Sequence, residues 1–169
     1  MNKPLLGSVA LLFAATLTLT GCGQLQNLAN GGGDTAVRDD TTSEITDAGD
    51  IDVFTLAVGD CFNDVDTAEE ISSLPVVPCS DSHDNEVFYE FTLPDGDLPA
   101  ASEIDDAVLE NCAPAFASFV GMTYEESTLD YWDIRPTQEG WDSIGDRVVQ
   151  CAIFDPAGPV TGTLAGAQR

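Results

Sequence analysis

The chain has 169 residues, a length that suits one domain with a modest hydrophobic core. It carries 30 acidic residues against 5 basic ones, which gives a formal net charge of −25. This charge excludes most proteins that bind nucleic acid directly, because those proteins need a basic face to meet phosphate. It also argues against electrostatic binding to anionic lipid, while a hydrophobic fraction of 43% excludes a wholly disordered acidic chain.

Residues 1–21 have the pattern of a bacterial lipoprotein signal peptide. Lys3 gives a positive start, residues 5–19 form an uncharged run of apolar and small side chains, and Gly21 precedes Cys22. This run is short for a hydrocarbon layer of roughly 30 Å, and no basic stop-transfer cluster follows it. Because the order resembles a lipobox, we expect cleavage before Cys22 and acylation of its sulfur and new amino group, with palmitate as a typical chain. An ordinary signal peptide or an uncleaved anchor is the alternative.

The segment 22–51 is expected to be the lipidated cysteine followed by a flexible acidic linker. Three consecutive glycines at 31–33 lead into a run of Asp, Thr, Ser and Ala without a periodic apolar pattern. We place the folded domain at residues 52–169. The acyl chains would hold this domain at the extracytoplasmic face of the cell membrane, and the linker would lift it off the lipid surface.

Strands are expected on both sides of one long helix. Apolar and β-branched residues bounded by turn residues predict strands at 53–58, 75–79, 86–93, 129–136, 147–154 and 161–164. In the third strand, Val87, Tyr89, Phe91 and Leu93 would share one face and Phe88 would lie on the other. The Gly- and Asp-containing segment 140–146 is expected to be a loop.

The helix is expected to begin near Ser102, which forms an N-cap pattern with Asp105. Apolar side chains within 104–120 follow near-helical spacing, Pro114 is expected to kink or split the helix, and Gly121 is expected to end it. Strands flanking one helix predict the α+β class, as a small disulfide-stapled domain with antiparallel strands packed on one main helix.

Beyond the lipidation site, four cysteines remain: Cys61, Cys79, Cys112 and Cys151. Outside the cytoplasm such an even set indicates two disulfides, for which three pairings are possible. We favour Cys61–Cys79, which closes a loop in the N-terminal half, and Cys112–Cys151, which would join the helix to a late strand. The chain has no CxxC pair and a single histidine, so neither a structural zinc site nor a cofactor is expected. The alternative is that one of these cysteines acts as a catalytic thiol, but none of the four cysteines has a basic residue nearby in sequence.

Several short motifs, taken in order, resemble the septum-formation domain family of actinobacterial membrane-anchored proteins and lipoproteins. The resemblance covers about residues 56–166 and depends chiefly on the segments 58–62 (VGDCF), 76–80 (VVPCS), 145–147 (GDR) and 161–164 (TGTL). It implies an extracytoplasmic module associated with cell division or envelope biogenesis, and it implies no established reaction. A lipid anchor here would take the tethering role of the transmembrane helix in other members.

His83 and Glu86 form the first candidate site. A histidine with acidic neighbours can titrate near neutral pH, bind a metal ion or act in catalysis. The interpretation we favour is structural, with the ring nitrogens organising the loop after Cys79 by bonding Glu86 or a backbone carbonyl. The acidic run 60–70 offers oxygen atoms to calcium, but it lacks the internal glycine of an EF-hand, so a solvated loop is favoured.

Trp141 and Arg147 form the second candidate, a binding patch around the Gly-Asp-Arg motif. The structural interpretation, which we favour, is that Trp141 covers the core and Arg147 pairs with one of the many carboxylates. No catalytic residue is assigned, because abundant carboxylates do not establish the defined separation that a glycosidase needs.

The leading functional hypothesis is a lipid-anchored extracytoplasmic interaction module. It would bind an envelope or division protein without catalysis, with no metal, cofactor or nucleic acid. One alternative is an extracytoplasmic hydrolase acting on cell-wall material. The other is a metal or pH sensor centred on His83.

Overall fold

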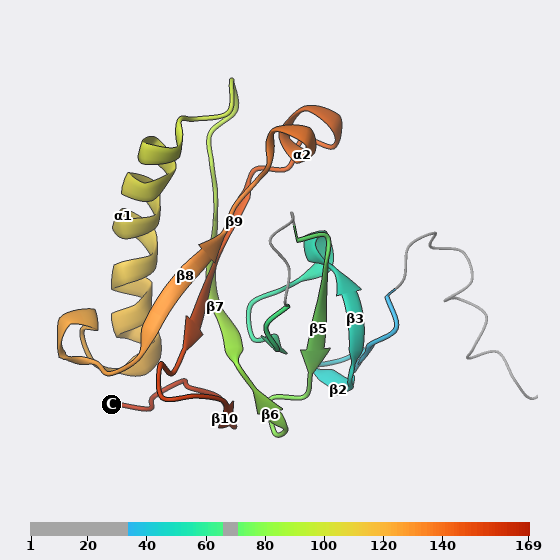
Figure 1. Cartoon of the computed structure of the whole chain (residues 1–169), viewed down its shortest axis with the longest axis vertical. Coiled ribbons are helices and arrows are strands. Elements are labelled where there is room, and N and C mark those ends of the chain that lie inside the picture. The colour runs from blue at the N-terminus through green and yellow to red at the C-terminus, as the bar shows by residue number, and fades with distance from the viewer. Residues whose placement is uncertain (1–33, 66–70) are drawn as a thin grey trace, which may run out of the picture. The chain divides into compact units, whose positions relative to one another are not determined.

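A computed structural model describes residues 34–65 and 71–169, and its main element is a six-stranded antiparallel sheet (Figure 1). The strand order is β3-β5-β4-β7-β9-β8. The strands are β3 (Gly49–Asp52), β4 (Cys61–Phe62), β5 (Ser73–Val77), β7 (Asn85–Thr92), β8 (Asp130–Ile134) and β9 (Val148–Phe154). Two small pairs join β1 (Val37–Arg38) to β2 (Ile45–Asp47) and β6 (Ser82–His83) to β10 (Val160–Thr161). With one long helix, α1 (Ala101–Val120), the predicted α+β class is confirmed.

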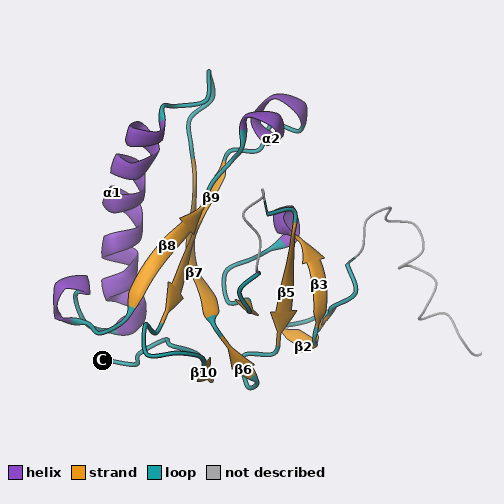
Figure 2. Cartoon of the chain, viewed as in Figure 1, coloured by secondary structure: helices purple, strands orange, loops and turns teal. Residues whose placement is uncertain are grey.

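The helix α1 lies along one face of the sheet beside β7, β8 and β9 (Figure 2). Its buried residues recur every four positions, so they form one stripe that faces the strands: Ile104, Val108, Cys112, Phe116 and Val120. Within the stripe, a disulfide between Cys112 and Cys151 links the helix to β9 with a Cα–Cα distance of 6.0 Å. This is one of the two pairings that the sequence favoured.

The opposite face of the sheet carries a second core. There β3, β5 and β4 curl over the central strands, and Phe62, Leu74 and Val76 pack against Val87 and Ala152. The second favoured disulfide, Cys61–Cys79, joins β4 to the turn after β5. The two faces of one sheet are therefore filled by two separate clusters of apolar side chains.

A β-bulge in β7 decides which residues enter each core. The register with β9 shifts between Val87 and Tyr89, so Phe88 is an extra residue without a partner on the neighbouring strand. Phe88, Phe91 and Leu93 pack in the core beneath α1, whereas Val87 packs in the core on the other face. The prediction that Val87, Tyr89, Phe91 and Leu93 share one face, with Phe88 on the other, is wrong. The bulge shifts the alternation by one residue, so Val87 lies on the opposite face from Phe91 and Leu93, and Phe88 lies on their face.

Part of the expected linker is ordered. Residues 34–51 include β1, β2 and most of β3, which pairs with β5 from Gly49↔Val76 to Asp52↔Ser73. Arg38 anchors this segment, since its guanidinium donates two hydrogen bonds of 2.6 Å to the buried carboxylate of Asp60. This pairing raises the pKa of Arg38 above its ordinary value. Within 34–51, the expectation of a flexible linker is therefore wrong, because period-two apolar patterns are too short there to signal strands.

Four other local predictions are also wrong. The segment 53–58, expected to be a strand, begins with a short 3₁₀-helix, η2 (Val53–Thr55). The segment 140–146, expected to be a loop, contains most of a second α-helix, α2 (Gln138–Ser143). The N-cap residue of α1 is Ala100, two residues before the expected N-cap Ser102, because the Glu103 carboxylate accepts a hydrogen bond from the N–H of Ala100. The helix also continues through Pro114, although Gly121 ends it as predicted, in the left-handed conformation with φ 79°.

The expected signal peptide, the lipidation site Cys22 and residues 22–33 of the linker lie outside the described residues. None of the helices in the described part of the chain is both long enough and apolar enough to cross a membrane.

The Cys112–Cys151 bridge closes a longer loop than Cys61–Cys79, with sequence separations of 39 and 18. We predict that replacing both Cys112 and Cys151 by alanine lowers the free energy of unfolding by about 3 to 4 kcal/mol, mainly by freeing the unfolded chain. Replacing Cys61 and Cys79 together should cost slightly less. Urea denaturation followed by circular dichroism measures both losses, and unchanged stability without Cys112–Cys151 would contradict the structural role of that bridge.

Candidate functional site

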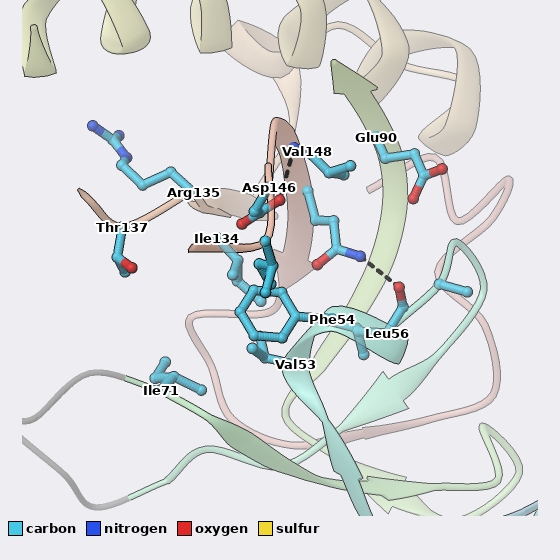
Figure 3. A pocket seen from close by; sticks show the side chains of 13 residues that line it. Val53, Phe54, Leu56, Ile71, Glu90, Ile134, Arg135, Thr137, Asp146 and Val148 are labelled. Carbon is cyan, nitrogen blue, oxygen red and sulfur yellow. Dashed lines mark hydrogen bonds between the residues drawn. The ribbon is translucent and has the colours of Figure 1, made fainter. Parts of the chain in front are cut away.

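A groove of about 460 Å³ opens on the face of the sheet opposite α1 (Figure 3). Its floor is formed by residues of β7, β8 and β9, and its walls come from η2 and from the segment around α2. Figure 3 shows the ring of Phe54 at the centre of this groove, near Ile134. The groove is the space on this face that the second core leaves unfilled.

Large apolar side chains at the groove are exposed to solvent. The exposed fractions are 56% for Phe54, 63% for Ile144 and 39% for Val148. A neighbouring hollow of about 370 Å³ shares Phe54, Ile71 and Ile144 and extends over α2. Exposed apolar side chains that gather around one concavity are typical of a surface that another molecule covers.

Hydrogen bonds fix both walls of the groove. The Asp52 carboxylate accepts a bond from the N–H of Phe54, which caps η2, and Gln150 donates a 2.6 Å bond to the carbonyl of Leu56, which ties η2 to β9. On the other wall, Thr137 caps α2 by accepting from the N–H of Gly140. The exposed apolar side chains are therefore held on ordered backbone, so binding there would need little rearrangement.

The charge at the groove is negative. Arg135 is a basic residue of the lining, but its guanidinium is bonded to Asp133 and Asp105, and these bonds keep its pKa above the ordinary value. Glu90 and Asp146 also line the groove, and Glu139 lines the neighbouring hollow. None of these three carboxylates forms an ion pair within the described ranges 34–65 and 71–169.

The first predicted site, His83 with Glu86, lies elsewhere and is buried. His83 is fully buried on β6, and its Nδ1 bonds the backbone carbonyl of Asp81 at 2.9 Å. The Glu86 carboxylate accepts bonds from the hydroxyl of Thr163 and the N–H of Leu164. Glu86 and a backbone carbonyl were the two partners expected for the histidine ring, and the ring bonds the backbone carbonyl.

At the second predicted site, the side chains of Trp141 and Arg147 make contacts within the fold. The indole is 3% exposed and donates to the carbonyl of Gly96, and the Arg147 guanidinium stacks 3.5 Å from the centre of the ring. Arg147 also donates to the carbonyls of Trp141 and Asp146, and its Nε lies 3.6 Å from the carboxylate of Asp95. These contacts cover one end of the core and do not place either side chain in the groove.

In the acidic run, Asp60 is buried against Arg38 and Asp64 accepts a bond from Asn85, while residues 66–70 lie outside the described part.

Sequence reasoning missed the groove residues Phe54, Ile71 and Ile144. The available signal was Ile144, a large aliphatic residue within the Gly- and Asp-containing expected loop 140–146.

A family model described as Septum formation matches residues 22–164. This range includes the groove, both disulfides and both of the predicted sites. No curated protein and no solved structure matches the chain.

Proposed function

The chain belongs to the septum formation family, which supports a role in cell division, and we propose that it is a lipid-anchored extracytoplasmic binding module. In this proposal the groove around Phe54 holds a segment of a division or envelope protein, and no reaction takes place. The main observation in support of this binding function is the exposure of Phe54, Ile144 and Val148 around one ordered concavity.

The chemistry of the groove selects the partner. Its exposed apolar side chains favour leucine, isoleucine or similar side chains, and its carboxylates, which form no ion pair within the described residues, favour lysine or arginine beside them. The exported chain would carry −26 in side-chain charge, because cleavage before Cys22 removes the single lysine and leaves 4 basic and 30 acidic residues. Such a surface repels anionic wall polymers, so a basic, partly apolar protein segment is the occupant we propose.

The groove also argues for binding without catalysis. Among the described residues, its lining contains Thr137 but no histidine, cysteine or serine, and the Thr137 hydroxyl already accepts the capping bond of α2. Asp146 likewise accepts a bond from the N–H of Val148. These polar groups support the walls of the groove, whereas a nucleophile paired with a base would point to hydrolysis.

The groove hypothesis predicts selective binding of basic apolar peptides. A ten-residue peptide of alternating leucine and lysine should bind the domain at least about tenfold more tightly than its leucine–glutamate counterpart, and salt should weaken that binding. Fluorescence anisotropy of labelled peptides, with the full chain titrated in, measures both affinities.

Three matched substitutions locate the binding site, and none of them changes the net charge. Phe54→Ser and Ile144→Ser should each weaken binding of the leucine–lysine peptide several-fold, because each removes an apolar contact. Leu109→Ser, at a 64% exposed position on α1, should leave the affinity unchanged. Equal loss in all three variants would mean non-specific attraction and would contradict the groove as the site, as would tighter binding of an anionic wall polymer.

The proposed anchor makes a separate prediction. Because two or three acyl chains at Cys22 would bind the membrane strongly, Cys22→Ala should move the protein from the membrane fraction to the soluble fraction. Fractionation of cells followed by immunodetection measures the distribution. Unchanged membrane association of Cys22→Ala would contradict the lipid anchor, and Ser8→Ala, within the expected signal peptide, is the control that should remain on the membrane.

A further inference from the structure

His83 carries a buried nitrogen that has no hydrogen-bond partner among the described residues. The ring is fully buried, and Nδ1 lies 2.9 Å from the carbonyl oxygen of Asp81. A carbonyl oxygen only accepts, so Nδ1 must hold the proton, and Nε2 of the neutral ring then presents a free lone pair. No hydrogen-bond partner for Nε2 exists among the described residues. A buried polar atom in this state calls for an explanation, because leaving it unsatisfied is unfavourable.

Two other electron-pair donors lie beside this ring. A ring nitrogen of His83, the sulfur of Cys61 and a carboxylate oxygen of Glu86 all lie within 4.8 Å of one another, and all three residues are buried. Each Glu86 oxygen accepts one hydrogen bond, from Thr163 or from Leu164, and keeps a second lone pair. The cluster therefore combines the sulfur, nitrogen and oxygen atoms that bind zinc.

The disulfide prevents this set from acting as metal ligands, because Cys61 is bonded to Cys79 and has no thiolate. The two cysteines differ in burial. Cys61 is fully buried, whereas Cys79 is only partly buried, and both line a hollow of about 690 Å³ with Gly59, Ser80 and Glu86. Because Cys79 is the more exposed residue, attack of a dithiol on its sulfur is the favoured route, and Cys61 then leaves as the thiolate, beside His83.

We propose that the Cys61–Cys79 bridge covers a latent zinc site formed by Cys61, His83 and Glu86. A dithiol reductant gives two electrons and two protons to the bridge, becomes a disulfide itself, and leaves two cysteine thiols. Zinc then displaces the proton of the Cys61 thiol and binds its sulfur, Nε2 of His83 and an oxygen of Glu86, with water in the fourth position. A disulfide oxidant re-forms the bridge and releases the ion: it takes two electrons from the sulfurs of Cys61 and Cys79, receives the Cys79 proton and one proton from water, and becomes a dithiol.

The geometry requires only a small adjustment. In a tetrahedral zinc site the ligand atoms lie roughly 3.3–3.8 Å apart, given bonds of about 2.0–2.3 Å. Cys61 can rotate toward His83 once its bond to Cys79 is broken, and His83 is held on β6 by the bond to Asp81 and by the pairing of β6 with β10. The histidine therefore has the second partner that orients a metal ligand, here a backbone carbonyl.

Two single variants test the site without any reductant. Cys79→Ser frees the thiol of Cys61, and Cys61→Ser frees that of Cys79; both lose the same bridge and keep Cys112–Cys151. All variants are made in the full chain with Cys22→Ser, so that Cys22 neither binds metal nor exchanges disulfides. The probes are Zn²⁺ alone, by calorimetry, and Co²⁺ alone, by absorption of its thiolate charge-transfer band.

We expect Cys79→Ser to bind Zn²⁺ at least about 100-fold more tightly than either Cys61→Ser or the chain with the bridge intact, and to give the Co²⁺ band. Adding His83→Gln or Glu86→Gln to Cys79→Ser should each lower the affinity at least about tenfold.

Equal Zn²⁺ affinity in Cys79→Ser and Cys61→Ser, or an affinity of Cys79→Ser that does not depend on His83, would overturn the proposal. If loss of the bridge unfolds the domain, Zn²⁺ should restore the folded circular dichroism spectrum of Cys79→Ser alone, because metal binding is coupled to folding. Failure of Zn²⁺ to refold it would equally overturn the proposal.

Discussion

One extra residue in β7 determines how both faces of the sheet are used. The bulge at Phe88 places this ring, Phe91 and Leu93 beneath α1, while Val87 faces the second core. With strict alternation, Phe91 and Leu93 would lie on the face of Val87, and the core beneath α1 would lose them. Beyond the bulge, Glu90 instead faces the groove. The bulge at one unpaired position thus supplies apolar side chains to the core beneath α1 and places Glu90 on the face that carries the groove.

The two disulfides serve these two halves differently. Cys112–Cys151 lies within the core beneath α1 and joins the middle of the helix to β9, so it strengthens a contact that the apolar stripe already makes. Cys61–Cys79 closes a short local loop beside a buried histidine with a free lone pair. This bridge has one partly buried cysteine and lies next to a potential metal ligand, so it is the one for which we propose reduction and metal binding. The groove, on the other hand, is lined by neither disulfide.

Much of the fold could be predicted from the sequence. The strands near 75–79, 86–93, 129–136 and 147–154, the helix end at Gly121 and the α+β class all follow from apolar periodicity and turn residues. The bulge in β7 could not be predicted, because an extra residue changes the register without changing composition. The strands within 34–51 were missed for a related reason: they are two to four residues long and are held by tertiary contacts such as Arg38 with Asp60.

The candidate site was less predictable than the fold. Trp141 and His83 attracted attention as single, chemically distinctive residues, yet both are buried in structural contacts. The groove depends on Phe54 and Ile144, whose exposure follows from η2 and α2, and sequence patterns predicted a strand and a loop there. Exposure of an apolar side chain is a property of the folded surface, so local sequence carries little signal for it.

We propose that the groove around Phe54 binds a basic, partly apolar protein segment at the cell envelope. The most direct measurement places a photo-reactive amino acid at position 144, or at position 109 on the opposite face, in the full chain in living cells. Mass spectrometry then identifies the attached peptide. Binding in the groove predicts one discrete protein adduct from position 144, through a segment containing lysine or arginine beside apolar residues, and no such adduct from position 109. The same adducts from both positions, or attachment of wall polymer at position 144, would contradict it.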